Sequence, residues 1–253
     1  MILTCEHASN ALPPGYTWSA DDQLLVEDHW AFDPGARGLC LELQERLQSP
    51  AILSRFSRLF CDINRAELKV TGGVESFGST PFLTVAEDRP VQLNSRLDEA
   101  EMERRLAGAW RPYHRSLHSL VVGSPGNTLL FSIHTFTRMF NPGSGATIVP
   151  RTVEVGILCC PATDLRAGCP ARLLLDHLQV NGVDARVNDP YGGPDGPGGA
   201  VGSAGSVGAV RPTLMIEVRN DLVDEPAFRH KLMTALLHCL GGSAVPEATR
   251  ANL

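Results

Sequence analysis

Three features are missing from this sequence, and each absence excludes a class of protein. No apolar run approaches the length of about 20 residues that a membrane-spanning helix needs. The 22 Lys and Arg residues are outnumbered by 28 Asp and Glu, so the net charge is −6. The composition therefore lacks the excess of basic residues that binding to nucleic acid or anionic lipid favours. The opening residues MILTCEHASN lack the basic and long apolar regions of a signal peptide. We therefore expect a cytoplasmic protein that binds neither a membrane nor nucleic acid, in an oligomeric state that the sequence leaves open.

Cysteine pairing and domain linkers are also missing. The seven cysteines are odd in number and scattered, and the adjacent Cys159 and Cys160 suit neither a disulfide framework nor a zinc-finger spacing. We expect reduced, mostly buried thiols. No charge run or Ser/Pro tract marks a linker, and 253 residues with 43% hydrophobic content are enough for one sizeable core. The sequence therefore predicts a single domain over residues 1–253.

Short apolar runs alternate with helical patterns along the chain. Because these runs are continuous rather than alternating, both faces of each strand are expected to be covered, as in a parallel or mixed sheet. The pattern predicts a three-layer α/β/α sandwich with a mixed, mostly parallel sheet. The predicted strands are Ile2–Cys5, Ala51–Ser54, Thr128–His134, Val153–Cys159, Val183–Asn188 and Thr213–Arg219.

Four helices are predicted from apolar residues spaced three and four apart. The first opens at Asp33, with Pro34 at the first helical position. The second runs from Leu97 to Val122, with a kink or break at Pro112. The third covers roughly Leu165–Leu178, disturbed at Pro170, and the last opens at Asp224-Glu225-Pro226 and carries Phe228, Leu232, Leu236 and Leu240. Two stretches, Thr71–Ser95 and Asp189–Val210, are expected to be loops, which at this length are often lids or binding loops.

Titratable side chains stand at the ends of three separate predicted strands. Glu6 and His7 follow the first, His134 ends another, and Glu217 lies in the last. Ligands bind outside the carboxyl ends of strands in open α/β sheets, so these residues are expected to converge. Two histidines and a carboxylate suit a divalent metal, zinc above all, with a position left open for water. Each residue alone is more often a hydrogen-bonded strand end; the combination favours a site.

Five motifs carry a family resemblance. In this order, CEHASN, DHWAFDPGA, SRLFCDINR, SIHTFT and IEVRNDL resemble the N-formylglutamate amidohydrolase family, over a span from Leu3 to about Leu240. SIHTFT, CDINR and IEVR are also similar, more distantly, to motifs of zinc carboxypeptidases. The resemblance implies a phosphorylase/hydrolase-like sandwich and a metal-dependent amidohydrolase with one divalent ion, Zn²⁺ before cobalt or manganese.

The resemblance also implies residue roles. His7 and His134 become metal ligands, and Glu217 becomes the catalytic base. Arg65, with Asn64, would hold the substrate carboxylate, because the Arg fork matches a carboxylate in a bidentate way. Arg58 or Arg55 would polarise the scissile carbonyl or hold a second carboxylate, for which Arg138 is a further candidate.

The third metal ligand is where the chain departs from the carboxypeptidases, which place a glutamate three residues after the first histidine. Here Asn10 stands at that position, where an amide oxygen is a weaker zinc ligand. Asn10 is also a candidate substrate contact, and the third ligand stays open between Asp33 and Asn10. Asp33 is the preferred replacement, although Asp before Pro at a helix start is equally typical of an N-cap. Less favoured candidates are Asp28, His29 and Glu6.

Other residues carry simpler expectations. Tyr191 either reaches the substrate or anchors the glycine-rich loop. His114 and His118 share a helix face, and we expect them at its surface rather than at a metal. Asp62 is expected to orient the turn before Asn64 or to pair with an arginine, and Arg219 to pair with a nearby carboxylate.

The sequence leaves three functions to separate. The first is hydrolysis of an N-acyl amino acid, with N-formyl-L-glutamate giving glutamate and formate. The second keeps the chemistry but acts on another acyl amino acid, a small peptide or a cell-wall fragment. The third is a catalytically silent small-molecule binding protein, against which the joint presence of His7, His134 and Glu217 argues.

Overall fold

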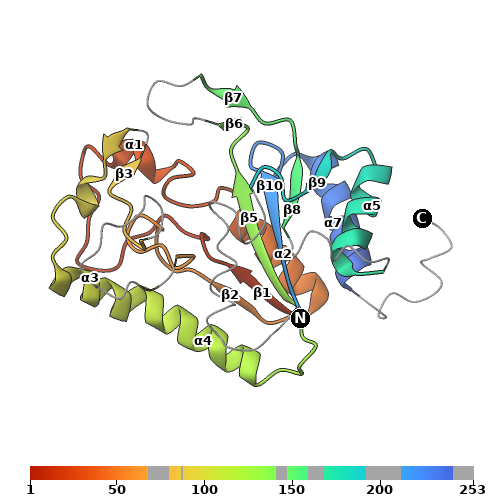
Figure 1. The fold of residues 1–253 in the computed structure, drawn as a ribbon, viewed down its shortest axis with the longest axis horizontal. Helices are drawn as coiled ribbons and strands as arrows, with labels where there is room; N and C mark the ends of the chain where they lie inside the picture. Colours follow the sequence, from red (N-terminus) through yellow and green to blue (C-terminus); the bar gives the residue numbers. More distant parts are fainter. Residues whose placement is uncertain are drawn as a thin grey trace.

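The computed structural model describes residues 1–65, 67, 80–86, 88–140, 147–158, 168–191 and 212–241. A six-stranded sheet runs through the centre, in the order β2-β1-β5-β10-β8-β9 (Figure 1). Its strands are β1 (Ile2–Cys5), β2 (Ala51–Leu53), β5 (Leu130–Phe136), β8 (Val155–Leu158), β9 (Ala185–Val187) and β10 (Thr213–Arg219). Neighbouring strands are parallel except β10 and β8, which are antiparallel. The predicted mixed, mostly parallel sheet is confirmed.

The strands are continuous apolar runs because both faces of the sheet are covered. Neighbouring residues of one strand belong to different clusters: Leu3 and Phe131 pack in one, Ile2 and Leu130 in the other. The first cluster takes its helical side chains from α2 (Ala36–Leu47), α5 (Pro170–Val180) and α7 (Pro226–Leu240). The second takes them mainly from α4 (Arg111–Val122). Helices therefore lie on both faces, in three layers.

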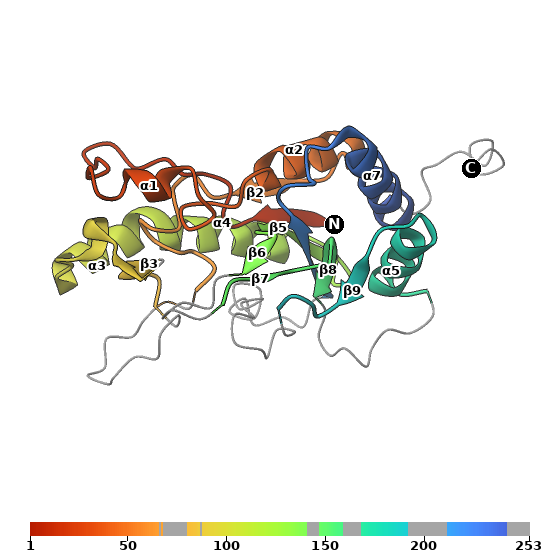
Figure 2. The ribbon, with the colours of Figure 1, turned by 90° about the horizontal axis from the view of Figure 1, so that it is seen from above.

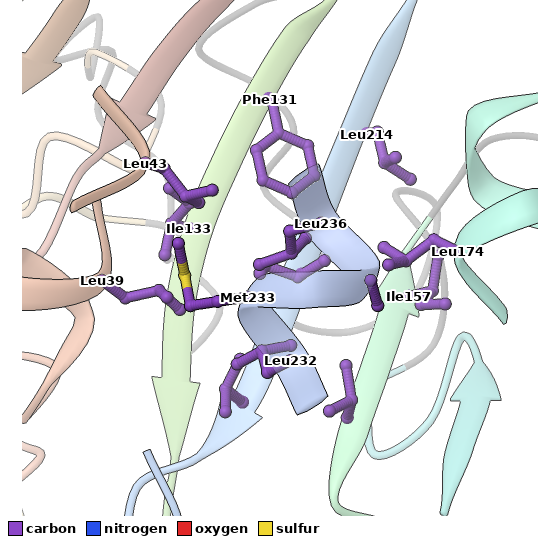
Figure 3. Packing of buried hydrophobic residues seen from close by; sticks show 14 of the residues in the cluster. Leu39, Leu43, Phe131, Ile133, Ile157, Leu174, Leu214, Leu232, Met233 and Leu236 are labelled. Atoms are coloured by element: carbon purple, nitrogen blue, oxygen red, sulfur yellow. The ribbon is translucent and has the colours of Figure 1, made fainter. Parts of the chain in front are cut away.

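The larger cluster is built around α7. Figure 2 shows α2 and α7 along the same side of the sheet, and Figure 3 shows their side chains meeting over the strands. Leu39 and Leu43 of α2 approach Ile133 and Met233, while Leu174 of α5 lies near Ile157. This packing fixes α2, and with it the segment that leads into α2.

The predicted helix 97–122 is divided in the structure. It consists of α3 (Glu99–Arg105), a π-helical stretch, η2 (Leu106–Trp110), and α4. Pro112 lies at the start of α4 and has no N–H to donate to the preceding turn, so the predicted kink or split takes the form of a π-helical stretch directly before it, in a backbone that stays helical throughout. Asp98 caps α3 by accepting a hydrogen bond from the backbone N–H of Glu101 at 2.7 Å.

The remaining elements are short. They are α1 (Gln23–Val26), β3 (Val85–Ala86), β4 (Arg89–Pro90), η1 (Gln92–Asn94), β6 (Met139–Phe140) and β7 (Val149–Pro150). Residues 80–95 of the first predicted loop therefore contain a β3–β4 pair and a helical turn, and residues 71–79 lie outside the described residues. Of the second loop only residues 189–191 are described, and of the third predicted helix residues 165–167 are not.

Five cysteines lie in the described residues, and all five are free thiols. Cys5, Cys40 and Cys61 are buried, whereas Cys169 and Cys239 are partly exposed. Cys159 and Cys160 lie outside the described part of the chain. Within the described residues, no helix combines the length and the apolar character needed to cross a membrane.

Candidate metal centre and active site

Three buried side chains meet where the central strands end. His7 follows β1, Asp33 precedes α2, and His134 lies in β5. His134 Nδ1 is 2.7 Å from Oδ2 of Asp33, and His7 Nδ1 is 3.4 Å from the same oxygen. One ligand-type atom from each residue lies within 4.8 Å of the others. Two imidazoles and a carboxylate around one point are a donor set that could hold a divalent ion.

Asp33 is placed by the turn that begins α2. Its backbone N–H donates to His7 O at 2.9 Å, which ties the turn to the end of β1. The helix begins at Ala36, with Gly35 as the N-cap, so the prediction that Pro34 is the first helical residue is wrong. The side chain of Asp33 does not cap the helix; its Oδ2 faces the two histidines. Geometry thus favours the metal ligand over the cap.

Each histidine has a second carboxylate on its far side. His7 Nε2 lies 2.8 Å from Oδ1 of Asp62 in a hydrogen bond. His134 Nε2 lies 3.1 Å from Oε2 of Glu6. Such partners orient metal-binding imidazoles and fix which ring nitrogen faces the ion. Both histidines accordingly present Nδ1 toward Asp33.

Glu6 is held in place behind His134. Its carboxylate accepts hydrogen bonds from Ser132 Oγ at 2.7 Å and from Tyr113 OH at 3.2 Å. Burial alone raises the pKa of Glu6, but His134 and Ser132 outweigh it and bring the pKa to about 2. Glu6 is therefore ionised, and its place behind the imidazole makes it a partner of His134 rather than a third ligand.

The other carboxylates near the histidines are ionised for similar reasons. Burial raises the pKa of Asp33, but the histidines outweigh it and hold that pKa well below its usual range. Burial also raises the pKa of Asp62, but the charges of Arg58, the largest opposing group, and of His7 outweigh it and lower that pKa. Burial also lowers the pKa of His134, yet Asp33 and Glu6 together raise it well above normal.

Glu217 differs from these carboxylates. It pairs in register with His134 across β10 and β5, and it lines the same pocket. Burial raises its pKa to about 7, opposed in part by the charge of His134. Oε2 of Glu217 is buried without a hydrogen-bond partner in the described residues. A carboxyl group with a free oxygen and a pKa near neutrality suits proton transfer.

The segment after β2 brings polar side chains to the pocket. Asp62 accepts a hydrogen bond from the backbone N–H of Asn64 at 2.9 Å and one from Arg58 Nη2 at 3.1 Å. Arg65 Nε lies 3.6 Å from Asp62 Oδ2. Asp62 thus orients this turn and pairs with arginine, as predicted, and its contact with His7 was not anticipated. Oδ1 of Asn64 is buried without a partner among the described residues.

The pocket has a volume of about 620 Å³. The residues from the sequence predictions that line it are His7, His29, Asp33, Arg58, Asp62, Asn64, Arg65, His134, Tyr191 and Glu217. Residues that the sequence did not single out are Trp30, Thr80, Leu83, Thr135, Thr137, Met139, Phe140, Ile148 and Arg151. No periodic pattern or motif distinguishes Arg151 in the sequence, because its neighbours belong to a short hairpin strand.

Other predicted residues lie apart from this pocket. Asn10 donates its amide to Val26 O at 3.0 Å and to Glu27 Oε1 at 3.2 Å, so its position does not support a substrate contact. Arg55 stacks on Phe56 beside a second pocket. Arg138 is exposed, and it is not among the residues that line the first pocket.

Four further expectations have structural outcomes. The prediction that His114 lies at the helix surface is wrong: it is buried, with Nε2 2.9 Å from Ile63 O. His118 is exposed, as expected. Asp28 forms an ion pair with His29 instead of facing His7. Arg219 pairs with Asp221 at 2.7 Å, as predicted.

Comparisons with known proteins identify one matching family and two similar folds. A family model described as N-formylglutamate amidohydrolase matches residues 1–223. Among solved structures, a gene product of Agrobacterium tumefaciens is 29% identical, with a TM-score of 0.73 over 95% of this chain and 88% of that one. An N-formylglutamate amidohydrolase from Ralstonia eutropha is 18% identical, with a TM-score of 0.68 over 94% of this chain and 91% of that one. At this identity, the similarity shows the fold alone. Among curated proteins there is no match.

Proposed function

The chain belongs to the N-formylglutamate amidohydrolase family, and from this premise we propose that it hydrolyses the amide bond of an N-acyl amino acid in a metal-dependent reaction. The preferred substrate is N-formyl-L-glutamate, which gives L-glutamate and formate. The observation that carries the proposal is Glu217, a buried carboxyl with one oxygen that no described residue pairs, beside the group of two histidines and an aspartate.

The residues present fit a divalent ion. His7 and His134 would hold it through Nδ1 and Asp33 through its carboxylate, while Asp62 and Glu6 orient the imidazoles from behind. Two imidazoles and one carboxylate are a ligand set of catalytic zinc sites. When bound, such an ion supplies Lewis acidity to the amide carbonyl and to a water molecule.

Glu217 would move the protons. A water oxygen attacks the acyl carbon while Oε2 of Glu217 accepts the proton that the water loses. The carboxyl then passes this proton to the amine nitrogen as the carbon–nitrogen bond breaks, so that one water is consumed for each acid and amine released. A pKa near 7 allows the same group to accept and release a proton at neutral pH.

The arginines would position the substrate. Arg65 lies 3.6 Å from Asp62 and is one quarter exposed, so its guanidinium can reach a ligand carboxylate without losing that neighbour. The buried Oδ1 of Asn64, which has no partner in the described part of the chain, offers an acceptor for a substrate N–H. Arg58 contacts Asp62 and lies 3.7 Å from Asp33, a position from which it would polarise the acyl carbonyl.

The first test is metal content measured together with formate release. Elemental analysis gives the metal content of purified wild type and of His7→Ala, Asp33→Ala and Asn10→Ala. Each of the four proteins is also assayed for formate release from N-formyl-L-glutamate. We expect stoichiometric metal and formate release in wild type and in Asn10→Ala, and loss of both in the other two variants. Asn10→Ala is the matched control, because Asn10 lies outside the pocket.

Each contrary outcome has a distinct meaning. Metal without formate release would retain a hydrolase and redirect the search to other N-acyl amino acids or to small peptides. The apolar residues Leu83, Met139, Phe140 and Ile148 in the pocket lining favour this second candidate. A wild type that takes up no metal under any loading condition would overturn the mechanism and favour a binding protein.

A further inference from the structure

Arg151 stands in the pocket wall on a scaffold of aromatic rings. It directly follows β7, and its backbone N–H donates to Arg138 O at 2.8 Å, which continues the β6–β7 hairpin. Its guanidinium carbon lies 4.6 Å from the ring centre of Phe140, 5.1 Å from that of Tyr191 and 5.5 Å from that of Phe136. Such stacking favours a cation and restricts the conformations of a long side chain.

The positive charge of Arg151 is not neutralised in the described residues. No carboxylate there lies within ion-pair distance of its guanidinium, whereas Arg58 and Arg65 both approach Asp62. Arg151 Nη1 contacts Thr137 O at 3.3 Å and Tyr191 OH at 3.4 Å. Nε and Nη2 have no hydrogen-bond partner among the described residues. With respect to the described residues, one edge of the guanidinium thus remains open for a bidentate contact with a carboxylate.

The other cations of the pocket already have partners or proposed uses. Arg58 contacts Asp62 and Asp33, and Arg65 is the candidate for the substrate α-carboxylate. Arg55 and Arg138, the sequence-based candidates for a second carboxylate, do not line the pocket. A substrate with two carboxylates therefore requires a further cation, and Arg151 meets that requirement.

We propose that Arg151 binds the side-chain carboxylate of the substrate and makes the site selective for N-acyl derivatives of acidic amino acids. The aromatic rings restrict the guanidinium to one region before the substrate is present, so little conformational freedom of the side chain is lost when the carboxylate binds. This inference rests on the proposed function, because it assigns the substrate class of the same pocket.

The test compares N-formyl-L-glutamate with N-formyl-L-glutamine, which differ in the charge of the side chain. Metal-loaded wild type should show a higher kcat/KM for the glutamate compound. Arg151→Met should lower kcat/KM for N-formyl-L-glutamate about 10- to 100-fold, the range for loss of a hydrogen bond to a charged group, and change that for N-formyl-L-glutamine less than about 3-fold. Arg151→Lys should restore part of the preference, since it keeps the charge without the fork.

Arg138→Met is the matched control: it removes an exposed arginine from the same hairpin and should leave both values unchanged. Equal losses on both substrates in Arg151→Met, or no loss, would overturn the assignment. If wild type turns over neither compound, N-formyl-L-glutamate is excluded as the substrate while this inference is still tested. Calorimetry on the metal-loaded protein would then have to show tighter binding of the glutamate compound, abolished in Arg151→Met; equal or absent binding would reject it.

Discussion

At the scale of single residues, neighbouring groups decide what each carboxylate can do. Asp33, Asp62 and Glu6 face histidines or arginines, which outweigh burial and keep the pKa values of their carboxyl groups low. Glu217 is buried, with one oxygen that no residue of the described ranges contacts by a hydrogen bond, and burial dominates, so its pKa rises to about 7. The first three can serve as anionic ligands and partners of ligands. Only Glu217 among these four is set to exchange a proton near neutral pH.

Glu217→Gln should separate metal binding from turnover. The amide keeps the size of the side chain but cannot accept a proton, so kcat should fall by about 100- to 10,000-fold while metal content stays that of wild type. Single-turnover kinetics and elemental analysis on the same samples give both values. A variant with near-normal kcat would remove Glu217 from proton transfer.

The same substitution should alter how stability depends on pH in the metal-free protein. The pKa of Glu217 lies near 7 when folded and near its ordinary 4.5 when unfolded, so its contribution to stability is lost as pH rises between these values. Glutamine does not titrate. The difference in unfolding free energy, Glu217→Gln minus wild type, should therefore grow by about 1–3 kcal/mol between about pH 5 and about pH 8.

Thermal denaturation at a series of pH values measures this difference. Glu45→Gln, on the exposed surface of α2, is the control and should show no such trend. A constant difference between Glu217→Gln and wild type across the range would mean that Glu217 keeps an ordinary pKa in the folded protein.

At the scale of elements, the start of α2 ties the candidate metal ligand to the core. Gly35 has φ of 85°, a left-handed conformation that other residues adopt only with strain. A Cβ at this position would overlap Cγ1 of the buried Val223. Asp33 lies two residues earlier, so this tight turn governs where its carboxylate points.

Gly35→Ala should lower the free energy of unfolding by roughly 2–4 kcal/mol, from backbone strain and overpacking together. It should also weaken metal binding, because the turn that carries Asp33 must shift. Gly38→Ala is the matched control in the same helix: a Cβ there meets its nearest neighbour, Arg229 Nη2, at 4.0 Å. That change should stabilise by about 0.5–1 kcal/mol and leave metal affinity intact. Equal thermal shifts in the two variants would contradict this account.

Elements that depend on local apolar pattern were predictable, and side chains that depend on distant packing were not. β1 and β10 have their predicted bounds, because their apolar runs end sharply in polar residues. The sequence does not decide the role of Asp33, because the same local sequence is compatible with a helix N-cap and with a metal ligand. His114 was placed on the surface wrongly, because the segment at Ile63 that covers it lies 51 residues away. Arg151 acquires its setting from three separate aromatic rings.

At the scale of the whole molecule, metal should stabilise the fold, since the proposed ligands join β1, the α2 turn and β5. An ion at 100 times its Kd should contribute about 3 kcal/mol, or roughly 5–10 °C in Tm for a chain of this size. Thermal scans with and without added Zn²⁺ measure the shift. His134→Ala should lose it, whereas His118→Ala, on the exposed face of α4, should retain it. Equal shifts in both variants would place the ion elsewhere.

The place of β10 in the sheet has a consequence for biosynthesis. β10 is the last strand in sequence among the described residues, yet it lies between β5 and β8. On the ribosome, the three proposed ligands are complete once His134 has emerged, while the two halves of the sheet still lack the strand that joins them. Glu217 arrives with that strand. The proposed proton acceptor therefore joins the three proposed ligands only when β10 enters the sheet between β5 and β8.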